Sequence, residues 1–577
     1  MSDDWQAKQA AEQRAAANAV ALVSQVLSMT RFGEAAIGSF GASRGRMLNL
    51  GTISPMTSET ALSRVVEIRQ GQVQQLLATA SHPAAKEALE KAIPMTFRAY
   101  LRVIKERDGY SKAEDHFLYS IWDRDRHEPN LKGYVSYLCD LDTTLGNYIT
   151  QTVPVPLPAD ELKRHSYIVG AAGAGKSELL KILIHEHVAD GNAAVVVVDA
   201  HSDLCEQIAR WPTVAADDRL VFISPVLFGD MVPCINPLSP PAGADDRTRE
   251  KIANRLAEVI GDFCRGEGGG STVRMVSLAK AALRVLLDRP GSTLQDFHQM
   301  LAEDPPPGLI EAGKKHHDEV VRWFFLNDWL GADYKAAKAA MRARLLQLLL
   351  HKDFRDMTCA PSTVPLYELV DAGKVILFSL GQAGSDSARV VGMLVVSLLA
   401  AMGDVRKETG REDRRPVHIV LDECHNFVGP ATRTILTELR KYGMHLTLAN
   451  QYVKQLPMDD RDAVLSNSQI KILGRSDYAP AMLAAMGCDN DEGRFLARSL
   501  SGGVFLVKWG AGEAFMMQAR SDYADDTNQI TKSQWIALKA DQRVFYRQPH
   551  DEARALPSLG GKPIERMQEG NFTRDLD

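Results

Sequence analysis

Eight consecutive residues have the composition of a loop that surrounds phosphate groups: Gly170, Ala171, Ala172, Gly173, Ala174, Gly175, Lys176 and Ser177. Glycines let backbone N–H groups approach an anion closely, the lysine neutralises phosphate charge, and the serine hydroxyl is a ligand for Mg²⁺. The apolar run 166–169 precedes this loop and a helical pattern follows it, which is the order that the motif requires. A Gly- and Ala-rich turn that matches by chance is the alternative. The run predicts a P-loop that binds ATP and Mg²⁺.

Two adjacent carboxylates, Asp422 and Glu423, follow an apolar run. In a P-loop ATPase, the first carboxylate of such a pair lies in the Mg²⁺ shell and the second orients or deprotonates the attacking water. A buried strand with a solvated acidic end is the common alternative, so the pair is a strong signal only together with the glycine-rich loop. The two motifs predict ATP hydrolysis by Lys176, Asp422 and Glu423, with Ser177 and Asp422 as the ligands of Mg²⁺.

Short apolar runs that alternate with helical patterns indicate parallel strands buried on both faces of a sheet. We expect strands at 166–170, 193–200, 375–380, 417–422, 445–450 and 503–507. Residues 246–356 are helical in pattern and contain a Gly-rich loop at 266–271, so they separate the two motifs by more chain than a nucleotide-binding core needs. The predicted class is α/β: a RecA-like P-loop nucleotide-binding domain with an inserted all-α domain and a mainly helical N-terminal domain.

Changes in texture divide the chain into five parts. These are a mainly helical accessory domain at 1–150, the first part of the nucleotide-binding domain at 151–245, the all-α insertion at 246–356, the second part of the nucleotide-binding domain at 357–547, and a polar tail at 548–577. The accessory domain holds no chemical motif, and its role stays open.

The bulk composition is that of a globular chain. Of 577 residues, 45% are hydrophobic and 24% are charged, which argues against disorder and against a membrane protein. The net charge of -6 means that nucleic acid would need a local basic surface or a pore. Cysteine spacing suggests neither a zinc site nor a disulfide framework. The most apolar stretch, 390–402, is too short for a bilayer and the N-terminus is not a signal peptide, so we expect a buried core helix and no direct membrane insertion.

Residues 439–452 resemble the type IV coupling proteins of conjugation (the TraD and TrwB kind), which belong with the HerA and FtsK DNA translocases. The resemblance runs from about 164 to about 523, with the shared segments in the same order and spacing. These segments are RHSYIVGAAGAGKS, VVVVDAHSDL, INPL, the helical insertion, VLDECHNF, the run from RKYG to Gln451, and NSQIKILGRSD.

The resemblance implies a homo-oligomeric ring of six subunits that couples ATP hydrolysis to the movement of DNA. Arg440 matches the arginine finger that completes the site of a neighbouring subunit, and Gln451 matches the polar residue that senses the γ-phosphate. Both residue types suit these catalytic roles, because a guanidinium stabilises charge on a transferred phosphoryl group and an amide contacts water and phosphate. A surface role for Arg440 stays open, since Arg433 and Arg475 compete for the part of the finger.

The implied cargo is single-stranded DNA with an attached relaxase, passed to other proteins of a secretion system. Many coupling proteins carry N-terminal transmembrane helices and this chain shows none, so we expect a cytoplasmic protein that reaches the inner membrane through a partner. Three other functions stay open: a HerA-like DNA-processing translocase in repair or defence, a secretion ATPase that acts on protein cargo, and a non-hydrolysing adaptor. The intact residues of both motifs argue against the adaptor.

Two further groups of polar residues receive no role. Asp199, His201 and Asp203 follow a predicted strand, where polar loops are common, and no further metal ligand is evident. His316 and His317 are interpreted as part of a solvated helix face.

Overall fold

The computed structural model describes residues 162–264, 273–381, 385–408, 410, 414–510, 514–519 and 529–549, together with six short strands between 47 and 158. Apart from those strands, the predicted N-terminal domain lies outside the described residues. The same holds for the Gly-rich loop at 266–271 and for the tail from 550 onward.

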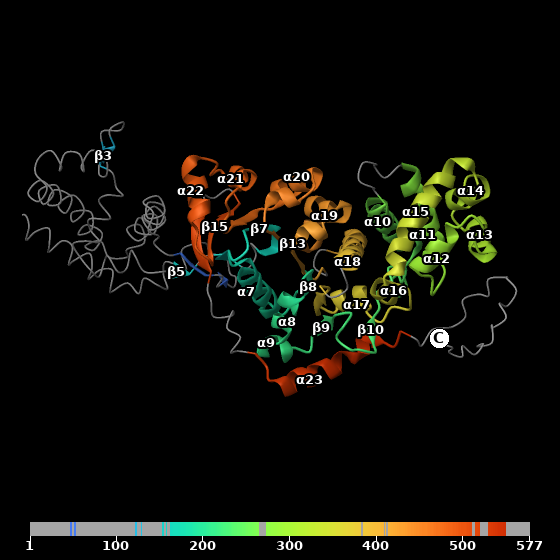
Figure 1. Cartoon of the computed structure of the whole chain (residues 1–577), viewed down its shortest axis with the longest axis horizontal. Helices are drawn as coiled ribbons and strands as arrows, with labels where there is room; N and C mark the ends of the chain where they lie inside the picture. Colours follow the sequence, from blue (N-terminus) through green and yellow to red (C-terminus); the bar gives the residue numbers. More distant parts are fainter. Residues whose placement is uncertain are drawn as a thin grey trace, which may run out of the picture.

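An 11-stranded sheet forms the centre of the fold (Figure 1). Its seven parallel strands lie in the order β14 (Ile470–Leu473), β7 (Ser166–Val169), β13 (Met444–Asn450), β12 (Val417–Asp422), β8 (Ala194–Asp199), β11 (Val375–Ser379) and β9 (Leu220–Ile223). The register pairs Asp422 with Asp199 and Asn450 with Val169, so the ends of these four strands are level. All parallel strands therefore present their carboxyl ends at one edge, where open α/β sheets bind ligands.

The sheet continues beyond β14 with antiparallel strands, which are β15 (Val504–Trp509), β16 (Phe515–Ala519), β2 (Gly51–Ile53) and β5 (Val153–Pro154). The expectation that the strand at 503–507 is parallel was wrong. The segment between β14 and β15 begins and ends against the glycine-rich loop, because Arg475 O accepts from Ala171 N and Gly503 N donates to Ala174 O. A chain that does not return to the amino edge can only continue as a reversed strand.

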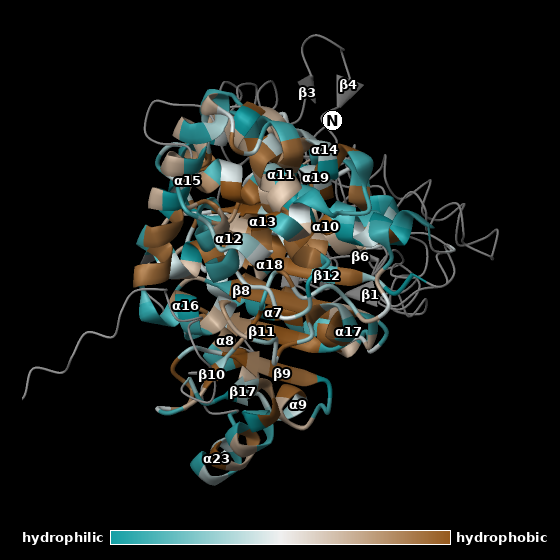
Figure 2. Ribbon diagram, turned by 90° about the vertical axis from the view of Figure 1, so that its right-hand side faces the viewer, coloured by the Kyte–Doolittle hydropathy of each residue, from teal (hydrophilic) through white to brown (hydrophobic). Residues whose placement is uncertain are grey.

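Helices cover both faces of the parallel strands. On one face lie α7 (Lys176–Ala189) and α8 (Asp203–Ala209), and on the other lie α18 (Ser385–Val405) and α10 (Asp246–Phe263). Alternate residues of β8 serve the two layers: Val195 and Val197 pack with α7, and Val196 and Val198 pack with α18. Figure 2 shows the strands and α18 as the hydrophobic centre, as expected for a sheet buried on both faces.

Helix α18 contains the apolar stretch at 390–402. Among the described residues, only Asp386–Glu408 is long and apolar enough to cross a membrane, and 89% of its most apolar window is buried inside the protein. The stretch is thus the buried core helix that the sequence predicted.

Residues 246–358 interrupt the sheet, because they lie in the chain between the neighbouring strands β9 and β11. Their described part forms helices, which are α10, α11 (Val273–Leu287), α12 (Leu294–Met300), α13 (Pro307–Lys314), α14 (Glu319–Asn327), α15 (Ala332–Leu350) and α16 (Lys352–Thr358). Asp245 caps α10 by accepting from Thr248 N at 2.9 Å. Figure 1 shows these helices gathered at one end of the molecule.

The last described segment crosses the outermost parallel strand. It consists of α23 (Lys532–Asp541), η9 (Gln542–Phe545) and β17 (Tyr546–Arg547), and β17 pairs with β10 (Val232–Pro233). Gln542 Oε1 accepts from Phe222 N at 2.8 Å, and the Tyr546 hydroxyl accepts from Ser224 N at 3.0 Å and donates to Phe222 O at 2.9 Å. Side chains of this segment thus satisfy backbone groups at the end of β9.

The remaining elements are short. They are α9 (Pro212–Ala215), α17 (Leu366–Asp371), η3 (Arg406–Glu408), η4 (Cys424–Asn426), α19 (Pro430–Thr434), the π-helix η5 (Ile435–Leu439), η6 (Arg440–Tyr442), η7 (Val453–Gln455), α20 (Met458–Asn467), α21 (Pro480–Met486), α22 (Asp491–Ser499), and the antiparallel pairs β1 (Met47–Leu48) with β6 (Leu157–Pro158) and β3 (Trp122–Asp123) with β4 (Glu128–Pro129).

Candidate nucleotide site at the carboxyl edge

The loop between β7 and α7 has the backbone of a phosphate cradle. Gly173 and Gly175 have φ of 74° and 92°, in the left-handed region that side chains disfavour. A Cβ on Gly175 would lie 2.9 Å from Gly503 N, so the neighbouring backbone leaves no room for a side chain. Ala174 N donates to Ala171 O at 3.1 Å and closes the turn. The predicted glycine positions are therefore the ones that the backbone requires.

Helix α7 starts at Lys176, directly after this loop. The Lys176 side chain is buried and its Nζ donates to Gly170 O at 2.9 Å, so the ammonium lies across the loop. Ser177 is exposed in the first turn, and the helix has no side-chain cap. Its first N–H groups and the positive end of its dipole thus face an anion that enters the loop.

Asn450, at the end of β13, joins the loop to the neighbouring strands. Its Oδ1 accepts from the Tyr167 hydroxyl at 2.9 Å, and its backbone O accepts from Gly170 N at 3.4 Å. Asn450 and Gly503 were missed by the sequence reasoning. An Asn at the end of a predicted strand that follows the RKYG segment was the available signal for the first, whereas nothing in the sequence places Gly503 beside the loop.

Asp422 ends β12 beside Asp199, which ends β8. Burial, together with the charges of Asp199 and Glu423, raises the pKa of Asp422 to about 6, while the Lys176 ammonium opposes this shift. Asp199 accepts from His201 N at 2.8 Å and Cys205 N at 3.1 Å, and burial raises its pKa. Two buried carboxylates at adjacent strand ends place oxygen atoms, the donors that a divalent cation prefers, at this edge of the sheet.

Glu423 adopts a strained backbone beside Asp422. Its φ of 47° is one of two positive values at non-glycine residues among those described. The side chain is buried, Oε1 accepts from Gln451 Nε2 at 3.2 Å, and Oε2 has no hydrogen-bond partner within the described structure. His425 Nδ1 lies 3.5 Å from Oε2, too far for a strong hydrogen bond. A buried carboxylate with one unused oxygen is suited to accept a proton from water.

Arg440 lies at the opposite edge of the sheet. It is exposed and precedes β13, whereas the loop follows the carboxyl end of the parallel strand β7. The seven residues of β13 alone span roughly 23 Å. An arginine side chain cannot cover this distance, so Arg440 cannot contact a phosphate bound in its own chain.

The structure therefore brings most predicted site residues together. The loop at 170–177, Asp422, Glu423 and Gln451 share the carboxyl edge, on β7, β12 and β13, which are neighbours in the sheet. Arg440 alone stands apart, at the amino edge.

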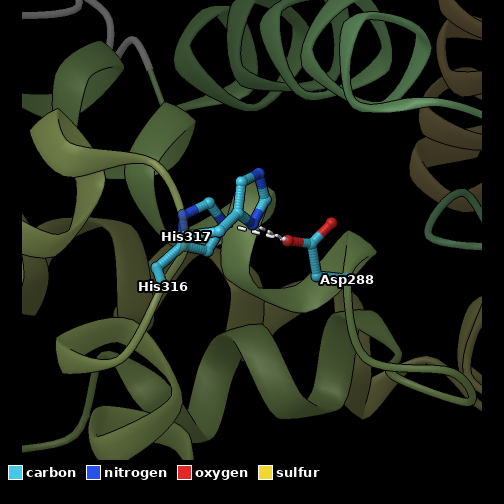
Figure 3. A group of neighbouring side chains, drawn as sticks. All are labelled: Asp288, His316 and His317. Carbon is cyan, nitrogen blue, oxygen red and sulfur yellow. Dashed lines mark ion pairs between the residues drawn. The ribbon is translucent and has the colours of Figure 1, made fainter.

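A second cluster of titratable groups lies among the inserted helices (Figure 3). His316 is buried in the turn before α14, so its interpretation as part of a solvated helix face was wrong. Its Nε2 lies 3.0 Å from Asp288 Oδ2, and burial lowers its pKa. His317 Nδ1 lies 3.3 Å from the same oxygen, and its Nε2 lies 3.1 Å from Asp246 Oδ2.

The hydrogen bonds of this cluster argue against a metal site. Asp318 N donates to His316 Nδ1 at 3.0 Å, so the neutral ring carries its proton on Nε2, the nitrogen that faces Asp288. A protonated nitrogen is no ligand, and both nitrogens of His317 face carboxylates. We assign Asp246, Asp288 and the two histidines as polar contacts that join α10, the end of α11 and the turn before α14.

Two segments of the chain match family models. Residues 143–207 match the central domain of helicase HerA, and residues 416–483 match the TraM recognition site of TraD and TraG. The chain is similar to the coupling proteins of the HerA and FtsK superfamily. The relationship predicted from residues 439–452 is confirmed by these two matches.

Similar solved structures include the bacterial conjugative coupling protein TrwB in its unbound form, with 15% identity over 64% of this chain and 88% of that chain and a TM-score of 0.47. TrwB with the ATP analogue ADPNP gives 14% identity, 64% and 87% coverage, and a TM-score of 0.47. VirB4 of Thermoanaerobacter pseudethanolicus gives 15% identity, 67% and 95% coverage, and a TM-score of 0.41. Among curated proteins there is no match to this chain.

Proposed function

We propose that the chain is an ATP-hydrolysing motor of the coupling-protein kind, which moves single-stranded DNA with its relaxase in conjugation or type IV secretion. The observation that carries this proposal is the placement of the loop at 170–177, Asp422, Glu423 and Gln451 at one edge of the sheet. This set contains an anion cradle, oxygen ligands for a cation and a base for water.

Binding of ATP is assigned to the loop and to the start of α7. The β- and γ-phosphates accept from the backbone N–H groups, and Lys176 exchanges its contact with Gly170 O for a phosphate oxygen. The Ser177 hydroxyl and the Asp422 carboxylate are the residues that would hold Mg²⁺, which neutralises phosphate charge when bound. This donor set fits because Ser177 is exposed beside the loop and Asp422 is a buried carboxylate with an adjacent carboxylate in Asp199.

Hydrolysis is assigned to Glu423 and Gln451. Glu423 Oε2 accepts a proton from the attacking water, while the amide of Gln451 holds Oε1 in place. The water oxygen forms a bond to the γ-phosphorus as the bond to the leaving ADP oxygen breaks.

Arg440 is assigned to the site of a neighbouring subunit. Its exposure at the amino edge supports contact between the amino edge of one subunit and the carboxyl edge of the next. Such a heterologous contact closes into a ring when the rotation allows, and we propose a ring of six.

We propose a RecA-like domain formed by 151–245 and 357–547, an all-α insertion at 246–356 and a helical accessory domain at 1–150. The protein is proposed to be cytoplasmic and to meet the inner membrane through secretion-system partners. The match to the TraM recognition site supports a partner protein of the relaxosome.

A HerA-like role in repair or defence is the second candidate. The match to HerA covers only residues 143–207, around the phosphate loop that both families share. The match to TraD and TraG covers 416–483, which contains Asp422, Arg440 and Gln451, and this favours the conjugative role.

The test is ATP turnover by the purified chain with and without single-stranded DNA. Lys176→Ala should abolish turnover and weaken ATP binding, and Glu423→Gln should lower turnover about 100-fold or more while ATP still binds. Lys532→Ala, an exposed lysine on α23, is the matched control and should be unchanged. Equal turnover by wild type and both site variants would refute the assignment.

Salt separates the cargoes. If phosphate contacts hold the DNA, its binding constant should fall steeply as the salt concentration rises. For single strands, a plot of the logarithm of the binding constant against the logarithm of the salt concentration should have a slope of about -0.7 per phosphate contact. If ATP turnover is unchanged by DNA but rises when a partner protein is added, the result would favour the secretion ATPase for protein cargo.

A further inference from the structure

Arg475 lies directly beside the phosphate loop of its own chain. Gly474 and then Arg475 come directly after the end of β14. Gly474 N donates to Val169 O at 2.7 Å. Arg475 O accepts from Ala171 N at 2.8 Å. The backbone of this arginine is thus fixed to the loop itself.

The side chain of Arg475 extends along the turn of the loop. Its Nη2 donates to Ala172 O over a long 3.4 Å, and a Cβ on Gly173 would lie 3.7 Å from Nη2. The residue is exposed, and within the described part of the chain it has no carboxylate partner. A guanidinium that is held by one weak hydrogen bond to a carbonyl keeps most of its five N–H donors for another acceptor.

The sequence left three arginines in competition for one role, and the structure separates them. Arg433 forms an ion pair with Asp460, a buried carboxylate, so its charge already has a partner. Arg440 is exposed at the amino edge. Only Arg475 reaches the loop that surrounds the phosphates in the same chain.

We propose that Arg475 contacts the terminal phosphates of the nucleotide bound in its own subunit, while Arg440 contacts the nucleotide of a neighbour. The inference rests on the proposed ATPase function. Arg475 exchanges its long bond to Ala172 O for charge-assisted hydrogen bonds to phosphate oxygens, which are shorter and stronger. The site thus has one arginine from its own chain and one from the next.

Steady-state turnover and nucleotide binding test the first half of this proposal. Arg475→Ala should lower turnover about 100-fold with the melting temperature unchanged, and Arg475→Lys should recover part of it, because a lysine keeps the charge but not the fork of donors. Arg494→Ala, an exposed arginine on α22 paired with Asp489, is the matched control and should keep wild-type turnover. Wild-type turnover by Arg475→Ala would overturn the inference and leave the proposed function standing.

Mixed oligomers test whether the two arginines act in different chains. Lys176→Ala subunits mixed with Arg440→Ala subunits should regain turnover, because the first lend Arg440 to the intact sites of the second. Lys176→Ala mixed with Arg475→Ala should stay inactive, since each chain carries a defect in its own site. Recovery in the second mixture would overturn the inference by placing Arg475 in the neighbour's site. Absence of turnover in the wild type, equal to Lys176→Ala alone, would instead overturn the proposed function and this inference with it.

Discussion

At Gly175, the conformation of the phosphate loop depends on the absence of a Cβ atom. Its φ is 92°, and an added Cβ would lie 2.9 Å from Gly503 N. Gly175→Ala should therefore destabilise the fold and lower the affinity for ATP at least about 10-fold, because the loop must move away from β15 to relieve the clash. Binding of a fluorescent ATP analogue and urea unfolding measure the two effects.

Gly191 offers the matched control for that substitution. Its φ of 69° is also positive, but a Cβ there would meet nothing within 4 Å. Gly191→Ala should cost about 1 to 2 kcal/mol of stability from the backbone alone and leave ATP affinity unchanged. If the two alanine variants lose the same affinity, the contact between Gly175 and β15 is not what shapes the loop.

Four buried histidines at the amino edge should make the protein labile to acid. Burial lowers the pKa of His165 to about 4 and of His187 to about 3, and it holds the pKa values of His418 and His445 well below the usual range. The unfolded chain binds protons on these rings below its ordinary pKa of about 6.5, and the folded chain does not. The contribution of these neutral rings to the free energy of unfolding is therefore fully present above about pH 6.5, and it is lost as the pH falls toward 4.

Protonation of Asp422 opposes the acid destabilisation caused by the four histidines. At pH 5.5 each buried histidine should lower the free energy of unfolding by on the order of 1 kcal/mol. Asp422, with a raised pKa of about 6, acts in the other direction by a similar amount. Urea unfolding between pH 7.5 and 5.5 should show a net loss, and His187→Gln should reduce its slope; a flat profile would contradict the neutral burial of these rings.

Sequence reasoning identified the site residues that carry chemistry within a motif. Lys176, Asp422 and Glu423 follow from spacing and residue type, and Gln451 follows from the resemblance, which implied a contact with the γ-phosphate and not the hydrogen bond to Glu423 that the structure shows. It could not identify Asn450 or assign Arg475 to its own chain. Their positions depend on which strands are neighbours in the sheet, and β7 is flanked by strands from distant parts of the chain.

At the scale of elements, the segment that crosses β9 is the least expected contact. The Tyr546 hydroxyl satisfies Ser224 N and Phe222 O, both of which would otherwise be buried without partners. Tyr546→Phe should lower the free energy of unfolding by about 1 to 3 kcal/mol, as expected when a buried donor and acceptor lose their partner. Val544→Ala, which alters an exposed neighbour, should cost less than about 0.5 kcal/mol in the same urea titration.

The strands that the sequence predicted are five to seven residues long, except for β7, which has four residues and was identified by the glycine-rich loop that follows it. The four-residue strands β9 and β14 were not predicted as strands, because runs this short cannot be told from turns or helix ends by periodicity. The direction of β15 was also mispredicted. Direction depends on where the preceding segment packs, and that segment is fixed by backbone hydrogen bonds to the loop.

For the whole molecule, the proposed site shared between two subunits would make activity depend on protein concentration. Turnover per subunit should rise with protein concentration through the range in which the oligomer assembles, while binding of an ATP analogue to the loop should change far less. Arg440→Ala should remove this dependence together with the activity. Turnover per subunit that stays constant on dilution to monomers, as followed by light scattering, would show that each chain contains a complete site.

The order of the strands in the sheet also has a consequence for synthesis of the chain. Strand β7 has β13 and β14 as its neighbours, and the hydrogen bond from Tyr167 to Asn450 joins residues 283 positions apart. A ribosome that adds 5 to 20 residues per second needs roughly 15 to 60 s to make that length of chain. Throughout this time β7, which is apolar, has no neighbour on either edge, because β13 and β14 have not yet been translated. The nascent chain is therefore most prone to aggregation, and most in need of a chaperone, before its last third has been translated.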